Sequence, residues 1–195
     1  MLLQIFRERV KAGREDDYRA AEEDAARICA RHQFPNPHLA MQAESGPNEV
    51  WWLNAFASDE ARRRVTAEYE ANVELVEALT AHGKRKRGLT DAAIDSVTAY
   101  RPDLSRAPWD PAGARFFVVR IAAGAMSSEG SVFEAPEGGF YSLGPKRTHE
   151  EAAAVAAVDP GATVFAVRPW WGHPAREWID ADPDFWRVNP TASAR

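Results

Sequence analysis

The sequence has one cysteine, no long apolar run and no excess of positive charge, and each absence excludes a class of protein. A lone Cys29 cannot form an internal disulfide and fits a reducing compartment. The longest apolar stretches, near 116–119 and 121–126, are far shorter than the roughly 20 residues of a membrane span. The net charge of -5 argues against a partner held through nucleic-acid phosphates. Because Arg7 soon interrupts the apolar N-terminus, we expect no secretory leader and a cytoplasmic protein.

Familiar catalytic and metal-binding motifs are also missing from the sequence. It has no glycine-rich phosphate loop, no nucleophile elbow and no pair of cysteines at metal-ligand spacing. His32 and His38 flank a Pro-Asn-Pro turn, but no third ligand stands at a recognisable spacing. We therefore predict no metal and no cofactor.

The 195 residues are 45% apolar and 27% charged, which is typical of a globular chain. The first hundred residues alternate between strand and helix patterns. The predicted elements are a strand over 2–10, a helix over 14–32, a hairpin of 38–44 and 50–56, a helix from 58 to 79, a basic loop over 82–88 and a strand over 96–101. This order predicts an α+β, ferredoxin-like βαββαβ unit with an antiparallel sheet and both helices on one face.

The second half repeats some of these signals in shortened form. Gly124 follows a strand pattern as Gly13 does, and Arg168-Pro169 ends one as Arg101-Pro102 does. Thr148-His-Glu-Glu151 is a capping box that opens a short helix pattern. We predict a ferredoxin-like domain at 1–106, a proline-rich linker at 107–113 and a degenerate second repeat at 114–195. Chance recurrence of short strand ends is the alternative.

The first half resembles the dimeric α/β-barrel superfamily, and within it the antibiotic-biosynthesis-monooxygenase-like group. The residues that carry the resemblance are a charged first strand ending in Val10-Lys11-Ala12-Gly13, an acidic helix start with Tyr18, and a tryptophan-rich strand entering Ser58-Asp59-Glu60. The resemblance implies two sheets stacked face to face as a barrel, in a homodimer. It covers half the chain and carries a topology rather than a catalytic motif.

Members of that superfamily include cofactor-independent oxygenases, haem-degrading enzymes and small-ligand binders. The haem-degrading branch uses an Asn on the first strand, a Trp on the third and a His on the second helix. The matching positions here fall on or near Phe6 and on Phe56, and the nearest histidine, His82, falls in the predicted basic loop. The resemblance therefore gives no support to haem degradation.

Candidate site residues come from the hairpin. A register pairing Glu44 with Glu49 would place Asn54 on an apolar face with Leu39, Met41, Ala43, Val50, Trp52 and Phe56. There Asn54 either bonds a neighbour as a structural residue or points into a pocket. His38 is the best acid–base candidate because imidazole titrates near neutral pH, although a structural histidine is the alternative. Adjacent Trp51 and Trp52 project to opposite faces, so both faces must be covered.

We consequently predict His38 and Asn54 as catalytic candidates. The predicted ligand-binding residues are Trp52, Phe56, Tyr69, Asn72 and Tyr100, with a core role as the alternative for Tyr69. The first functional hypothesis is a small apolar or aromatic molecule bound in the barrel pocket. The alternative is a cofactor-independent monooxygenase acting on an aromatic or polyketide-like substrate.

Two charged or aromatic segments complete the predictions. The basic run 84–87 is either solvated surface or a collector of anionic ligands at the barrel mouth. The aromatic tail from Trp170 to Trp186 has no long periodic element to carry it. We expect it to pack across the first domain or a partner subunit, or to plug an open barrel end.

Overall fold

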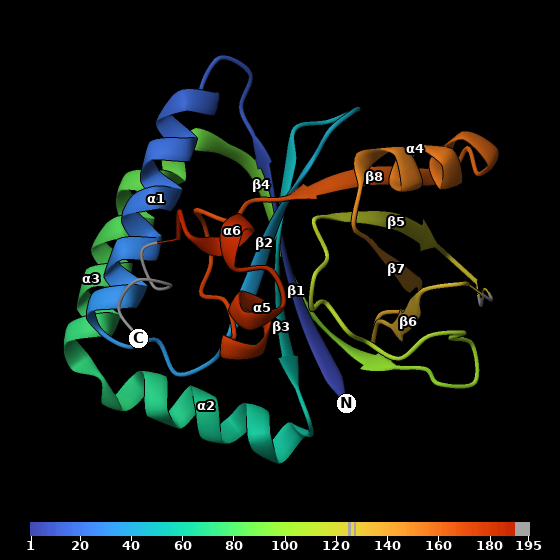
Figure 1. Ribbon diagram of the computed structural model, residues 1–195. Coiled ribbons are helices and arrows are strands. Elements are labelled where there is room, and N and C mark those ends of the chain that lie inside the picture. Colours follow the sequence, from blue (N-terminus) through green and yellow to red (C-terminus); the bar gives the residue numbers. More distant parts are fainter. Residues whose placement is uncertain (125, 127, 190–195) are drawn as a thin grey trace.

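The computed structural model describes residues 1–124, 126 and 128–189. The first half has the predicted ferredoxin-like order, and its sheet runs β4-β1-β3-β2 with antiparallel neighbours. Helices α1 and α3 lie on one side of this sheet, and the sheet formed by the second half of the chain lies on the other (Figure 1). The bounds are β1 Leu2–Val10, α1 Glu15–Arg31, β2 His38–Ala43, β3 Glu49–Phe56, α2 Asp59–Ala71, α3 Val73–Lys86, a 3-10 turn at Arg87–Leu89 and β4 Thr90–Tyr100.

The second half has the same strand order with fewer helices. Its strands run β8-β5-β7-β6, which matches β4-β1-β3-β2 position by position. Among the described residues between β5 and β6 there is no helix, so the counterpart of α1 is missing. The counterpart of the second helix is the short α4, opened by the predicted Thr148 capping box. The bounds are β5 Phe116–Ala122, β6 Ser131–Glu134, β7 Phe140–Lys146, α4 His149–Val158 and β8 Ala162–Val167.

The two sheets close into one barrel within a single chain. Met41 of β2 pairs with Val167 of β8, and Ala99 of β4 pairs with Glu134 of β6. The interior is filled with large apolar side chains that include Trp51, Phe117 and Phe133. The predicted ligand pocket therefore does not occupy the barrel centre. Barrel closure needs no second copy of the chain, and the homodimer stays a prediction.

The predicted hairpin register is wrong by one residue. His38 lies opposite Asn54 and Leu39 opposite Leu53, and the Glu44 amide bonds the Val164 carbonyl of β8 (3.0 Å) instead of pairing with Glu49. A shift of one residue turns every side chain to the other face. Trp51 therefore packs inside the barrel, whereas Trp52 and Asn54 face the helices.

The predicted second helix and basic loop also need correction. The helix breaks at Asn72, whose side-chain Oδ1 accepts the Leu75 amide (3.1 Å) and so caps α3. Helix α3 then continues to Lys86, so the predicted basic loop is largely its last turn. Basic residues there complement the partial negative charge of a helix C-terminus. Strand β4 consequently begins at Thr90, six residues before the predicted strand.

The aromatic tail closes one end of the barrel. Trp178 of α5 (Arg176–Ala181) and Trp186 of α6 (Pro183–Trp186) pack in the same apolar cluster as the barrel interior. Arg115, just before β5, anchors the tail through an Nε–Oδ2 contact of 2.7 Å with Asp182. Trp171 instead packs on the helix side, edge-on to Tyr18. The tail thus covers both a barrel end and part of the first half.

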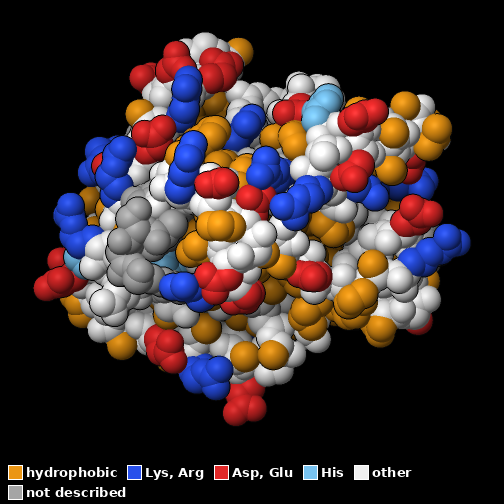
Figure 2. All heavy atoms as spheres, in the orientation of Figure 1, with side chains coloured by type: hydrophobic (Ala, Val, Ile, Leu, Met, Phe, Trp, Pro, Cys, Tyr) orange, Lys and Arg blue, Asp and Glu red, His pale blue; other side chains and the backbone are white. Residues whose placement is uncertain are grey.

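The molecular surface mixes both charges. Figure 2 shows acidic and basic side chains interspersed over the visible face, with hydrophobic atoms scattered among them. In the described part of the chain, no helix combines the length and apolar character needed to cross a bilayer.

Candidate functional site

A cavity of about 290 Å³ lies between the first sheet and helices α1 and α3. Its walls come from β1, β2, β3, β4, both helices and the loop after α1. The residues that line it are Gln4, Phe6, Glu22, Ala25, Cys29, Phe34, His38, Trp52, Asn54, Leu79, His82, Lys86 and Asp95. We call this cavity the helix–sheet cleft. It brings together three of the predicted residues, His38, Trp52 and Asn54.

One end of the cleft carries a row of polar side chains. His38, Asn54 and Gln4 lie opposite one another on β2, β3 and β1, so their side chains share the helix-facing side. Gln4 Nε2 donates to both carboxylate oxygens of Asp95 at 2.9 and 3.0 Å. Among the described residues the Asn54 amide has no hydrogen-bond partner, which leaves a donor and an acceptor for a ligand.

The other end of the cleft holds a cluster of buried ionisable groups. Lys86 Nζ lies 2.5 Å from Glu8 Oε2 and 2.6 Å from Glu22 Oε1. The Tyr18 hydroxyl donates to Glu8 Oε2 at 2.8 Å. These four residues, the polar cluster, join β1, α1 and the C-terminal end of α3. Buried charges persist only when they are paired in this way.

Aromatic rings surround the Lys86 ammonium. Its Nζ lies 4.7 Å from the Trp52 ring centroid and 5.3 Å from that of Tyr18, within cation–π range. Burial opposes the charge on Lys86, but Glu22 and Glu8 outweigh it and raise its pKa. Burial also raises the pKa of Glu22 against the opposing effect of Lys86. The prediction that residues 84–87 form either solvated surface or a barrel-mouth anion site is therefore wrong for Lys86.

His38 is held as a neutral imidazole. Burial, helped by nearby His173, lowers the pKa of His38 from 6.5 to about 4. Its Nδ1 lies 3.3 Å from the Asn36 carbonyl oxygen, which favours the tautomer protonated at Nδ1. In that tautomer Nε2 keeps its lone pair and can accept a proton or hydrogen bond.

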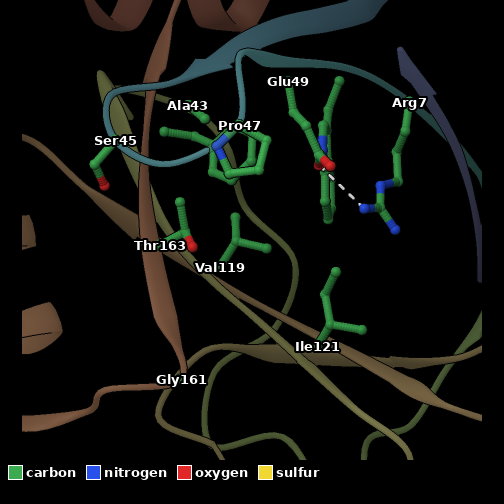
Figure 3. Close-up of a pocket in the computed structure, with 11 residues that line it drawn as sticks. Arg7, Ala43, Ser45, Pro47, Glu49, Val119, Ile121, Gly161 and Thr163 are labelled. Carbon is green, nitrogen blue, oxygen red and sulfur yellow. Dashed lines mark hydrogen bonds and ion pairs between the residues drawn. The ribbon is translucent and has the colours of Figure 1, made fainter. Parts of the chain in front are cut away.

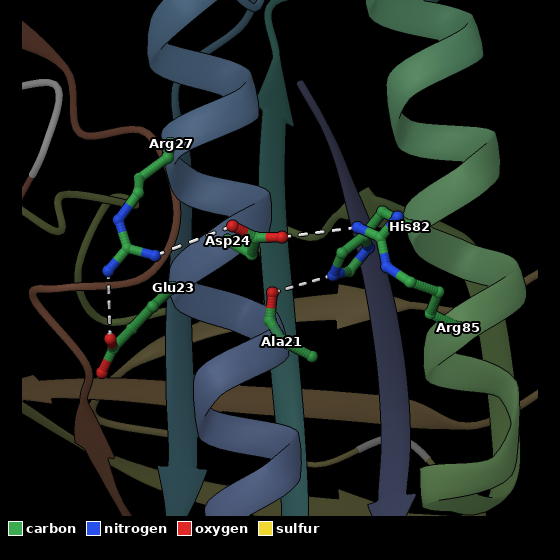
Figure 4. Close-up of polar contacts among 6 residues, drawn as sticks. All are labelled: Ala21, Glu23, Asp24, Arg27, His82 and Arg85. Carbon is green, nitrogen blue, oxygen red and sulfur yellow. Dashed lines mark hydrogen bonds and ion pairs between the residues drawn. The ribbon is translucent and has the colours of Figure 1, made fainter.

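His82 belongs to the cleft because α3 extends further than the sequence predicts. Its Nε2 donates to the Ala21 carbonyl of α1 at 2.8 Å, as Figure 4 shows. Burial lowers the pKa of His82, so this contact is made by a neutral ring. Nearby, Arg85 pairs with Asp24 at 3.3 Å at the surface. Together the two contacts fix the helices that form one wall of the cleft.

The remaining predicted residues lie outside the cleft lining. Tyr69 contacts Phe34 at 5.9 Å between ring centroids, and Phe34 in turn contacts His38 at 5.0 Å. Phe56 is buried on the same sheet face beyond Asn54. The Asn72 side chain caps α3 and donates to the His32 carbonyl. Tyr100 packs against the barrel core, on the opposite side of the sheet.

The polar cluster was not predicted from the sequence. Alternation along β1 places Gln4, Phe6 and Glu8 on one face. Because both faces of the sheet were expected to be covered, this pattern could have indicated buried polar side chains on that face. On α3, the four-residue spacing of His82 and Lys86 indicates a shared face.

Cys29 also lines the cleft, and burial raises the pKa of its thiol to about 12, so it is an unreactive thiol. Within the described residues, no three His, Cys, Asp or Glu side chains are grouped to hold a metal ion.

Comparison with solved structures identifies the fold. A proposed monooxygenase from Fusobacterium nucleatum superposes with a TM-score of 0.54 over 85% of this chain and 91% of its own, at 9% identity. A proposed monooxygenase from Lactobacillus acidophilus gives 0.47 over 85% and 93%, also at 9% identity. A NIPSNAP family protein from Agrobacterium tumefaciens gives 0.40 over 52% of this chain and 93% of its own, at 16% identity.

Sequence comparison adds no family. No family model matches the chain, and no curated protein matches it either. The structural likeness and the strand order together show an antiparallel, ferredoxin-like barrel that is closed by one chain.

Proposed function

With a ferredoxin-like barrel fold as the premise, we propose that this protein binds a small aromatic molecule in the helix–sheet cleft. The observation that carries the proposal is the lining of that cleft, where flat apolar walls meet a few polar groups. Phe6, Phe34 and Trp52 supply the rings, whereas His38 and Asn54 supply hydrogen-bonding atoms. A cavity of about 290 Å³ lies near the lower limit of ligand pockets, so a ligand of one or two rings fits best.

The polarity of the cleft narrows the chemistry of the ligand. Lys86 uses its ammonium on Glu8 and Glu22, so the site presents no unpaired cation to a strongly charged anion. The Asn54 amide and His38 Nε2 suit a hydroxyl or carbonyl group instead. Hydroxylated quinones and phenols combine these groups with a planar ring.

Titration with 5-hydroxy-1,4-naphthoquinone tests this proposal. Replacing Asn54 by Leu removes one hydrogen-bonding group, and we expect affinity to fall about fivefold. Replacing Trp52 by Leu removes a ring wall, and we expect a loss of about tenfold or more. Asn72→Ser is the matched control because it keeps the α3 cap outside the cleft lining, so binding should not change. Wild-type affinity in both cleft variants would contradict the proposal.

Catalysis is a second candidate function, favoured by the state of His38. Burial keeps His38 neutral at pH 7 but also makes it a weaker base, so proton transfer from an acidic, electron-rich aromatic molecule would rely on the Asn54 amide to stabilise the anion that forms. The resulting carbanion can reduce oxygen without a cofactor. For anthrone the balanced reaction gives anthraquinone and water: the ring CH₂ supplies the electrons and both hydrogens, one oxygen atom forms the new carbonyl, and the other leaves as water.

Aerobic and anaerobic incubation with anthrone separates the two functions. An enzyme would consume anthrone only with oxygen, faster than heat-denatured protein, and His38→Ala or Asn54→Ala would abolish the difference. Thermal unfolding of both variants shows whether they are folded. Consumption no faster than the denatured control leaves the binding function alone.

A further inference from the structure

A second pocket opens at the end of the barrel opposite the one that the aromatic tail closes. It measures about 210 Å³ and is lined by both halves of the chain (Figure 3). The residues that define its chemistry are Arg7, Glu49, Trp51, Val119, Ile121 and Thr163. We call it the mouth pocket. Arg7 follows Phe6 on β1, so their side chains point to opposite faces, and the mouth pocket is separate from the helix–sheet cleft.

The Arg7 guanidinium is fixed at one wall of the mouth pocket. Its Nη2 lies 3.0 Å from Glu49 Oε2, and its Cζ lies 4.6 Å from the Trp51 ring centroid. In Figure 3 the Arg7 and Glu49 side chains extend toward each other above Ile121. The Arg7 side chain is 17% exposed, so the group is largely withdrawn from water yet still reachable. Because stacking and pairing already order the Arg7 side chain, it loses less conformational entropy when a ligand binds.

The Glu49 carboxylate is shared among several donors. Besides Arg7, Glu49 accepts Trp51 Nε1 at 3.1 Å and pairs with Arg9 at 3.5 Å. Arg9 lies outside the lining, so within the pocket Arg7 and Glu49 carry no net charge, but the Arg7 guanidinium keeps N–H groups that Glu49 does not bond. Despite partial burial, the Trp51, Arg7 and Arg9 contacts lower the pKa of Glu49, so it stays ionised at neutral pH. Glu49 is a positioning residue here because its oxygens are already occupied.

The rest of the wall is mostly apolar. Val119, Ile121 and Phe165 come from the second half, and Ile121 is 48% exposed although it is a large aliphatic residue. Thr163 adds a hydroxyl that makes no hydrogen bond with any residue described in the structure. A positive group, a hydroxyl and an apolar wall together match a short molecule with one acidic end.

We propose that the mouth pocket binds a small monocarboxylate with an apolar body, such as an aromatic or short branched acid. Arg7 holds the carboxylate through the guanidinium hydrogens that Glu49 does not use, and the aliphatic wall of the second half covers the body. A fixed guanidinium recognises a carboxylate better than a flexible ammonium does. Because both halves contribute walls, the site exists only in the closed barrel.

Benzoate, benzamide and inorganic phosphate are the probes for calorimetric titration. We expect benzoate to bind and its neutral isostere benzamide to bind about tenfold more weakly or not at all. Phosphate lacks an apolar body and should be weaker than benzoate. Backbone amide NMR should show benzoate-induced shifts at Arg7, Ile121 and Thr163, with Asn54 of the helix–sheet cleft unmoved.

Arginine variants complete the test. Arg7→Gln should weaken benzoate binding about tenfold or more, and Arg7→Lys by an intermediate factor because the charge stays but the planar fork is lost. Arg9→Gln is the matched control, since that side chain also pairs with Glu49 but is 52% exposed and outside the pocket lining; a change below about twofold is expected. If Arg7→Gln fails to fold, Arg7→Lys carries the test.

Three results would contradict carboxylate binding at the mouth pocket: equal affinity for benzoate and benzamide, unchanged benzoate binding in both Arg7 variants, or NMR shifts confined to the helix–sheet cleft. None of them bears on 5-hydroxy-1,4-naphthoquinone, whose binding depends on Asn54 and Trp52. The two proposals can therefore fail separately.

Discussion

The two halves of the barrel contribute alike to its interior and differently to its outer faces. Inside, Trp51 of the first half contacts Tyr141 and Phe165 of the second, with ring centroids 5.9 and 5.0 Å apart. Outside, α1 and α3 cover the first sheet and enclose polar groups, whereas the second sheet has the short α4 and a small cluster of Leu104, Met126, Val132 and Phe140. The shared interior constrains both sheets to large apolar residues, so binding chemistry is left to the outer faces and the barrel ends.

The missing helix explains why the first half alone, among the described residues, encloses a cleft between two helices and its sheet. The second half instead has a cavity of about 550 Å³ between its single helix α4 and its sheet, lined among others by Val118, Arg120 and Val155. In the first half, two helices of 17 and 14 residues pack over the sheet and leave space between helices and sheet for side chains such as Lys86. In the second half, Leu104 from the segment after β4 packs with Met126 and Phe140 where a helix would otherwise lie. This small cluster holds no buried ion pair among its described residues.

Removing the Lys86 charge is the most severe test of this difference. Lys86→Met leaves Glu8 and Glu22 buried without their cation, and we expect the free energy of unfolding to fall by about 3 kcal/mol. Arg85→Met is the matched control at the preceding position of α3, where the side chain is 62% exposed, and should cost less than about 1 kcal/mol. Urea denaturation measures both.

A second substitution sharpens that result. Adding Glu22→Gln to Lys86→Met removes one of the stranded carboxylates and should restore part of the loss. Equal stability of Lys86→Met and Arg85→Met would show that the polar cluster contributes little to the first half.

The pH dependence of stability tests the burial of His38. The folded pKa of about 4 lies below the unfolded value of 6.5, so the unfolded chain binds an extra proton between these values. The contribution of His38 is therefore fully present above pH 6.5 and is lost as the pH falls toward 4. We expect the wild type to lose roughly 2–3 kcal/mol more than His38→Gln between pH 7 and pH 4. Parallel pH profiles of the two proteins would contradict the burial of a neutral imidazole.

The smallest expected effects come from one helix cap in each half. Ser58 Oγ accepts the Ala61 amide at 3.1 Å and Thr148 Oγ1 accepts the Glu151 amide at 3.2 Å. Ser58→Ala and Thr148→Ala should each cost about 1 kcal/mol and add in the double variant, because the caps are far apart in the fold. If the two halves share one core, we expect a single unfolding transition whose midpoint is lowered by both substitutions. Two transitions, each moved by only one variant, would show that the halves unfold independently.

Local patterns predicted the elements and their order well. The two helices predicted to begin near residues 14 and 58 and the Thr148 capping box each depend on residues close in sequence, and the structure has a helix at each of these places. The shortened second half was readable because its strand ends resemble those of the first. The sequence named His38, Trp52 and Asn54 as candidates, but its hairpin register put His38 on the face opposite Asn54; only the observed register brings the three together.

The predictions failed where distant residues decide the outcome. Strand β2 pairs with β8, more than a hundred residues away, as well as with β3, and a hairpin register read from local pairing takes no account of that second partner. Lys86 looked like part of a solvated basic run because its partners Glu8 and Glu22 lie on other elements. Tyr100 was placed in the ligand site because a strand pattern does not show which side of the sheet meets the second half.

By itself, the sequence determined the ferredoxin-like order of elements and the need to cover both faces of the first sheet, because hydrophobic periodicity and helix caps act over a few residues. Only the tertiary structure decided which face receives each side chain, that Lys86 is buried between two carboxylates, and that Arg7 lies at the mouth of a closed barrel. Those features depend on strand register and on the meeting of the two halves, and both are set by contacts between residues far apart in the chain.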